Sequence, residues 1–88
     1  MIITLELTMY PLHEDYKSQV LSFLDTFTSN DAFSFKVNAM STQVKGEMEP
    51  LMSWLQECIA KVYESGAKAA FIQKILPGDL DLDYQYNA

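Results

Sequence analysis

The spacing of apolar residues switches between two periods along this chain, and the order of the switches limits the fold more than any other feature. Each segment shows either the alternation of a strand or the 3.6-residue period of a helix. In chain order the predicted strands and helices span residues 2–10, 14–27, 33–40, 41–45, 49–65 and 69–76, with helices in second and fifth place. This βαββαβ order predicts an α+β fold, a ferredoxin-like sandwich whose four-stranded antiparallel sheet carries two helices on one face.

The first strand has an apolar face and a polar face, and this plan leaves the polar face without helices. The apolar side chains, which we expect to face the core, are Ile3, Leu5, Leu7 and Met9. The other face carries Thr4, Glu6, Thr8 and Tyr10. Because these side chains are too polar for a plain packing face, we expect the open side of the sheet to be a binding surface, a dimer surface or both.

Both predicted helices carry a single apolar stripe, which is typical of helices that cover a sheet. The first stripe consists of Tyr16, Val20, Phe23, Leu24 and Phe27. The second consists of Leu51, Leu55, Cys58, Ile59 and Val62. The strand at 69–76 is apolar on both faces apart from Gln73 and Lys74, and such continuity predicts cover on both sides. The open face is therefore expected to meet another chain.

Turn residues set the remaining boundaries. Gly46 is predicted to end the third strand. The turn between the second and third strands contains no Asn-Gly or Gly-Gly pair, so the register across residues 38–42 stays open. We assign residues 1–79 to a single ferredoxin-like domain. Residues 80–88 form an acidic C-terminal tail, which is expected either to be disordered or to add an edge strand in an oligomer.

Length and charge favour a small acidic domain with a small-molecule ligand. A chain of 88 residues buries only about 60–65% of its unfolded surface, so self-association would add useful burial. The net charge is −6 and the six basic residues are scattered lysines, which argues against nucleic acid and suits a cationic molecule better. No apolar run approaches the ~20 residues that span a bilayer. The N-terminus lacks the basic start of a signal peptide, so we expect a cytoplasmic protein.

No group of residues predicts catalysis or a metal site. The single histidine, His13, begins the first helix without a Ser or Cys nucleophile nearby. Cys58 is the single cysteine and lies among apolar residues, where a packed free thiol is expected. The spacing of Asp79, Asp81 and Asp83 matches part of a calcium loop, but the Gly and Glu of that loop are missing. We therefore expect a non-enzymatic protein without a cofactor.

Glu6 is the most informative single residue, because a carboxylate in the middle of a strand is disfavoured. It either faces solvent or lies in a partly covered cleft, where a shielded charge requires a partner such as an amine or a protonated heterocycle. The residues that could share its face are Tyr10, Asn38, Ser41 and Gln43. Their hydroxyl and amide groups would hydrogen-bond a polar ring without adding charge.

Three segments resemble the YkoF-like family of thiamine- and hydroxymethylpyrimidine-binding proteins and the related small thiamine-binding domain family. They are a strand ending in Tyr-Pro-Leu (3–12), a Ser-Thr-x-Val-x-Gly core (38–46) and a Pro-Gly-Asp turn (77–79). The resemblance implies a ferredoxin-like fold whose open sheet face packs against another such domain, with ligand sites near that interface. Longer members carry two such domains in tandem, so this single domain would have to form a homodimer or a homotetramer.

The family positions that carry over are Tyr10 and the segment of Ser41 and Thr42, although Thr42 is otherwise expected to point inward. Together with the sheet-face argument, the candidate ligand-binding residues are Glu6, Tyr10, Asn38, Ser41, Thr42 and Gln43. The resulting hypothesis is a cytoplasmic, non-enzymatic protein that binds thiamine or its hydroxymethylpyrimidine precursor and acts as an oligomer through its open face. One alternative is a regulatory or interaction module whose open face is only an oligomer interface. The other is a small dimeric α/β-barrel enzyme, against which the position of His13 argues.

Overall fold

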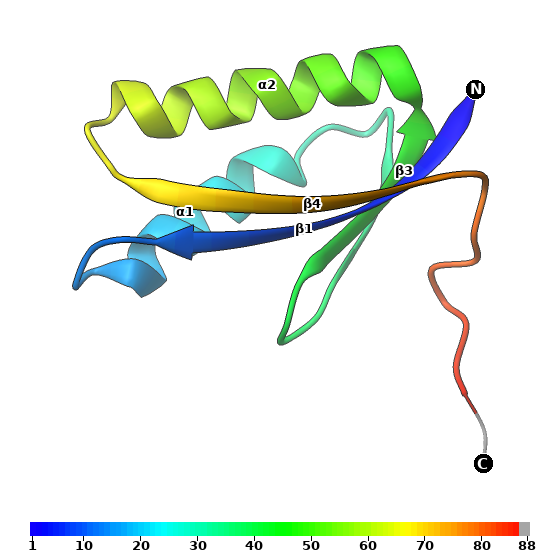
Figure 1. Cartoon of the computed structure of the whole chain (residues 1–88), viewed down its shortest axis with the longest axis horizontal. Coiled ribbons are helices and arrows are strands. Elements are labelled where there is room, and N and C mark those ends of the chain that lie inside the picture. Colours follow the sequence, from blue (N-terminus) through cyan, green and yellow to red (C-terminus); the bar gives the residue numbers. More distant parts are fainter. Residues whose placement is uncertain (87–88) are drawn as a thin grey trace.

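The computed structural model describes residues 1–86 and has the predicted architecture. The elements in chain order are β1 (Ile2–Pro11), α1 (Tyr16–Phe27), β2 (Ser34–Val37), β3 (Thr42–Glu47), α2 (Met48–Glu64) and β4 (Ala69–Pro77). The strand order in the sheet is β2-β3-β1-β4, and every neighbouring pair is antiparallel. Both helices pack on the same side of this sheet (Figure 1). The predicted ferredoxin-like α+β sandwich is therefore confirmed.

The hydrophobic core lies between the sheet and the two helices. β1 alternates as predicted, and its inward side chains Ile3, Leu5 and Leu7 are buried. The other buried apolar residues come from β3 and the helices, namely Phe23, Phe27, Val44, Leu51, Leu55 and Cys58. Burying one such large side chain stabilises the fold by about 1.5–3 kcal/mol. Because the core lies between the helices and one face of the sheet, the opposite face is the open one.

The first helix begins later than predicted, at Tyr16. Tyr16 is exposed and does not belong to the buried stripe, so its predicted role in the core was wrong. Side chains tilt toward the N-terminus of a helix, so the first residue points past the packed face. The buried residues of α1 are Phe23 and Phe27, as the helical spacing predicted.

The second helix lies beside the first, and Trp54 links them. Its indole Nε1 donates a hydrogen bond to the carbonyl oxygen of Phe27 over 2.8 Å. The Nζ atom of Lys61 lies 5.7 Å from the centre of the same indole ring, which is a cation–π distance. Within residues 1–86, neither helix combines the length and the apolar composition needed to cross a membrane.

The turn between β2 and β3 occupies residues 38–41, so the predicted boundaries of these two strands were wrong. The Oδ1 atom of Asn38 accepts hydrogen bonds from the backbone N–H groups of Met40 and Ser41 over 2.9 and 3.0 Å. The backbone N–H of Asn38 donates to the carbonyl oxygen of Ser41 over 3.0 Å. Asparagine side chains often replace backbone hydrogen bonds in turns. This one fixes the register that the sequence left open.

Gly46 lies within β3 and does not end it, which corrects the predicted boundary. It pairs with Ile3 of β1, and the strand continues to Glu47. A Cβ atom on Gly46 would lie 2.5 Å from Cδ1 of Phe33. Because the Phe33 ring fills the space of a side chain, glycine is required here by packing and not by strand termination.

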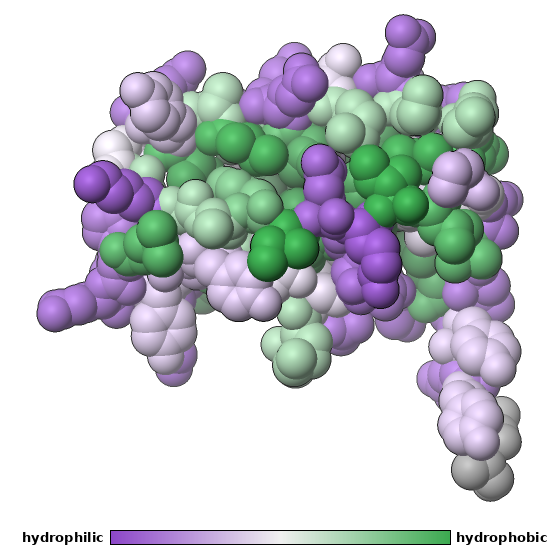
Figure 2. All heavy atoms as spheres, viewed as in Figure 1, coloured by the Kyte–Doolittle hydropathy of each residue, from purple (hydrophilic) through white to green (hydrophobic). Residues whose placement is uncertain are grey.

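The last strand, β4, forms one edge of the sheet and exposes apolar side chains. Ile72 is 59% exposed on the open face, and Leu76 is also exposed on that face. Ile75 faces the helix side but is exposed at the sheet edge. Figure 2 shows apolar side chains at the surface along β4 and along the adjoining side of α2. Cover on both sides of β4 would need a second chain and stays a prediction.

Candidate functional site

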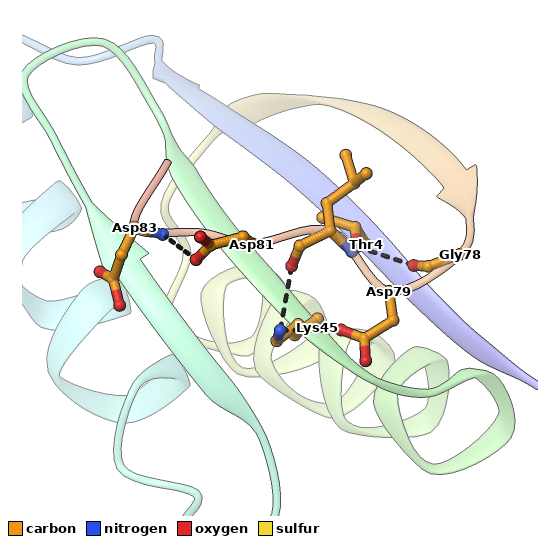
Figure 3. A network of polar contacts seen from close by, with 7 residues as sticks. Thr4, Lys45, Gly78, Asp79, Asp81 and Asp83 are labelled. Atoms are coloured by element: carbon orange, nitrogen blue, oxygen red, sulfur yellow. Dashed lines mark hydrogen bonds and ion pairs between the residues drawn. The ribbon is translucent and has the colours of Figure 1, made fainter. Parts of the chain in front are cut away.

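The C-terminal segment folds back over the open face of the sheet (Figure 3). We name residues 78–86 the C-terminal strap; residues 87 and 88 of the predicted acidic tail lie outside the described residues. The Oγ1 atom of Thr4 donates to the carbonyl oxygen of Gly78 over 2.8 Å and accepts from the N–H of Leu80 over 3.1 Å. Thr4 is consequently buried, although it lies on the open face. Contact with the strap therefore explains why a polar residue occupies this position of β1.

Two lysines of the open face hold the strap by ion pairs. The Nζ atom of Lys45 lies 2.7 Å from Oδ1 of Asp79 and donates to the carbonyl oxygen of Leu80 over 2.9 Å. Further along the strap, Nζ of Lys36 lies 2.9 Å from Oδ1 of Asp83. The hydrogen bond from Lys36, and then its positive charge, lower the pKa of Asp83 below its ordinary value. Exposed ion pairs of this kind contribute little to stability because water and salt screen them, so the strap is held reversibly.

A cavity of about 570 Å³ lies between the strap and the strands β1, β3 and β4. Its lining residues on the sheet are Thr4, Leu5, Glu6, Gln43, Lys74, Ile75 and Leu76. Those on the strap are Leu80, Asp81, Leu82 and Tyr84. Ligand sites in proteins usually measure about 300–1,000 Å³ and combine apolar walls with a few polar groups. This cavity has that size and that mixture.

Glu6 is the central polar group of the cavity. Its Oε2 atom accepts a hydrogen bond from Oγ of Ser41 over 3.1 Å, and its Oε1 atom lies 3.4 Å from Nζ of Lys74. Gln43 is its cross-strand neighbour on β3, and the two side chains share the open face. The Glu6 side chain is 38% exposed. Its carboxylate is therefore partly shielded but still reachable from the cavity.

The charges around the cavity favour a cation. Glu6 and Asp81 contribute two carboxylates to the lining, whereas Lys74 contributes one ammonium group. The Lys74 side chain is 79% exposed, and its 3.4 Å contact with Glu6 is long for a charge-assisted hydrogen bond. A ligand cation that approached Glu6 could displace this ammonium group into solvent at low cost. The arrangement suits a cationic or protonated heterocycle better than an anion.

The structure brings together only some of the predicted site residues. Glu6 and Gln43 line the cavity, and Ser41 contacts Glu6. Tyr10 lies on the same face but near the end of β1, is 51% exposed and does not line this cavity. The Oδ1 atom of Asn38 is occupied by the turn between β2 and β3.

Thr42 faces the helix side, as its predicted inward orientation requires. It pairs with Leu7 of β1 and is buried. Together with Asn38 and Ser41 it lines a second cavity of about 220 Å³ on that side of the sheet. No charged residue lines this second cavity. Ser41 therefore lies between an acidic cavity on the open face and a smaller uncharged cavity beside the helices.

The lining residues that were not predicted as site residues are Thr4, Leu5, Lys74, Ile75, Leu76, Leu80, Asp81, Leu82 and Tyr84. The last four belong to the strap, whose position depends on contacts with strands far away in the chain. A signal was present, because the strap alternates Leu with Asp opposite the lysines that the predicted open face carries. Charge complementarity between the two would have suggested the contact.

The other side chains considered for catalysis, His13 and Cys58, take part in the structure of the loops and the core. The Nε2 atom of His13 accepts a hydrogen bond from the backbone N–H of Lys68 over 2.9 Å, which joins the loops before α1 and β4. Cys58 is a buried free cysteine, and burial raises the pKa of its thiol. Among residues 1–86, no group of three or more His, Cys, Asp or Glu side chains is placed to hold a metal ion.

Comparison with solved structures supports the architecture. A Thermotoga maritima protein provisionally assigned to thiamine biosynthesis or salvage is 22% identical, with a TM-score of 0.73 over 85% of this chain and 82% of its own. A Streptococcus pneumoniae protein is 20% identical, with a TM-score of 0.78 over 91% of this chain and 90% of its own. A domain of unknown function, DUF77, from Bacillus cereus is 19% identical, with a TM-score of 0.75 over 94% of this chain and 85% of its own.

At this level of identity the similarity shows a shared fold. No protein-family model matches the chain, and no curated protein sequence matches it significantly. The resemblance to thiamine-related small domains agrees with the name of the Thermotoga maritima protein, whereas the YkoF-like assignment stays a prediction.

Proposed function

We propose that this protein binds thiamine or its hydroxymethylpyrimidine precursor in the open-face cavity and catalyses no reaction on it. The observation that carries the proposal is the Glu6 carboxylate, which lines a cavity of about 570 Å³ and forms a hydrogen bond with Ser41 and an ion pair with Lys74. The name of the Thermotoga maritima structure adds independent support for a thiamine-related ligand.

The chemistry of thiamine fits the polar groups of the cavity. Its thiazolium ring carries a permanent positive charge, which Glu6 and Asp81 would balance. Its aminopyrimidine ring presents an amino group and ring nitrogens, for which Gln43 offers both an acceptor and donors. Tyr84 supplies an aromatic side chain to the lining, and a cation against such a ring gains about 0.5–2 kcal/mol. Tyr10, a predicted ligand-binding residue, lies outside this cavity.

Self-association through the remaining open face is part of the proposal. The strap leaves Tyr10 and Ile72 exposed on this face, and both are large apolar or aromatic residues. Large exposed apolar side chains on one surface are typical of protein interfaces. A homodimer or a homotetramer in the cytoplasm would cover them. The same residues also favour a second candidate function, an interaction module in which the face serves assembly alone.

A thermal-shift titration with thiamine, hydroxymethylpyrimidine and thiamine phosphate at fixed protein concentration tests the binding proposal. A ligand that binds only the folded protein stabilises it by RT ln(1 + [L]/Kd), about 2.7 kcal/mol at a hundredfold excess over Kd. We expect a saturable rise in melting temperature with thiamine or hydroxymethylpyrimidine. If none of the three compounds shifts the transition, the interaction module replaces the binding protein.

A further inference from the structure

We propose that the C-terminal strap closes over a ligand bound in the open-face cavity and slows its release. The inference rests on the proposed function. It adds a segment that opens and closes and that contacts the ligand from the side opposite the sheet. The strap supplies the lining residues opposite the sheet, namely Leu80, Asp81, Leu82 and Tyr84. Without them the groups around Glu6 would form a shallow surface on the sheet rather than a cavity.

The strap bridges the open face of the sheet and leaves a space between itself and the strands. Its near end is fixed at Thr4, which bonds to both Gly78 and Leu80. Its far end reaches β2, where Asp83 pairs with Lys36. Between these points a space of about 570 Å³ remains above the strands. A segment that merely masked the face would pack against it, whereas this one leaves room for a small molecule.

The ion pairs that hold the strap are separate from the cavity lining. Neither pair, Lys45 with Asp79 or Lys36 with Asp83, contributes a lining residue. The pairs can therefore be removed without changing any side chain that would touch the ligand. Both acidic partners are more than half exposed, so breaking these pairs leaves no buried charge unpaired and the strap can open for entry and exit.

The test compares the full-length chain with two double variants, Asp79→Asn/Asp83→Asn and Lys36→Gln/Lys45→Gln. Both remove the same ion pairs, but the first makes the protein less negative and the second makes it more negative. A general electrostatic effect on thiamine, which is a cation, would therefore change affinity in opposite directions. Loosening of the strap would raise the dissociation rate in both variants, by about three- to tenfold.

Hydrogen exchange gives a readout that does not depend on any ligand. The N–H of Leu80 bonds to Thr4, and the N–H of Asp83 bonds to Oδ1 of Asp81 over 2.9 Å. We expect both amides to exchange faster in each double variant than in the wild type. Unchanged exchange would contradict the claim that these ion pairs hold the strap on the sheet. Faster exchange with an unchanged thiamine dissociation rate would contradict the claim that the strap slows release of the ligand. If the wild-type chain does not bind thiamine, the proposed function fails and the retention role fails with it. Hydrogen exchange would still show whether the ion pairs hold the strap on the sheet.

Discussion

The hydroxyl group of Ser41 donates a hydrogen bond to the carboxylate of Glu6 over 3.1 Å. This contact joins the turn between β2 and β3 to the middle of β1 and holds the carboxylate at the cavity. The other oxygen of the same carboxylate lies 3.4 Å from Nζ of Lys74 on β4. The carboxylate of Glu6 on β1 thus contacts groups from two other parts of the sheet, and a ligand cation would compete with only one of them, the Lys74 ammonium group.

Replacing Glu6 by Gln should weaken thiamine binding with little loss of stability. The substitution keeps the shape and an acceptor for Ser41 but removes the charge. Hydrogen bonds to charged groups contribute about 1.5–3 kcal/mol, so we expect the Kd from isothermal titration calorimetry to rise at least tenfold. The free energy of unfolding in urea should change by less than about 0.5 kcal/mol, because Glu6 makes no buried ion pair.

The matched control for this variant is Glu57→Gln, which makes the same change on the exposed surface of α2. It makes the protein less negative by the same single charge but lies outside the cavity lining. Its Kd for thiamine should equal that of the wild type. Equal weakening by the two substitutions would mean that overall charge, and not the position of Glu6, determines affinity.

Substitution of Gly46 by Ala should destabilise the fold through a steric conflict. The new Cβ would lie 2.5 Å from Cδ1 of the Phe33 ring, and overpacking of this kind costs about 1–3 kcal/mol. Urea denaturation measures the loss. The cost should shrink in a Phe33→Leu background, where the ring is absent. If the two substitutions instead add independently, the ring is not the cause of the loss.

The buried thiol of Cys58 should make stability fall at alkaline pH. Burial raises the pKa of this thiol in the folded protein, so the folded state holds the proton more tightly than the unfolded state. The contribution is fully present below the unfolded pKa, which is about 8.5, and is lost as pH rises through the folded pKa. Urea denaturation between pH 7 and pH 10, about the range of thiol ionisation, should show this decline.

A Cys58→Ala variant separates the thiol from other alkaline effects. It loses packing at every pH, but its stability should fall less steeply above the ordinary thiol pKa than that of the wild type. Parallel curves for the two proteins would show that Cys58 does not contribute to the decline. The native thiol should also react slowly with alkylating reagents, because it is buried and protonated.

Local patterns were sufficient to predict the architecture and the open face. The alternation of Ile3, Leu5 and Leu7 with polar residues placed Glu6 on the correct side of β1. The helical spacing likewise identified Phe23 and Phe27 as buried. These features depend on neighbours within one element, which the sequence displays directly.

Features that depend on distant parts of the chain were not predicted. The pair of Lys36 and Asp83 is separated by 47 residues, so no local period indicates it. The role of Gly46 depends on the ring of Phe33, which lies in the loop before β2. In contrast, the turn at Asn38 carried a local signal, since an asparagine that caps its own turn is a common motif.

The most direct test of the proposed site is a map of backbone amide chemical-shift changes as thiamine is added to the labelled full-length chain. We expect the changes to concentrate on the open face, at Glu6, Gln43 and the strap residue Asp81. Changes centred instead on Val20 and Leu24, which line the smaller cavity near Thr42, would move the site to the helix side. The absence of any saturable change would contradict thiamine binding by this protein.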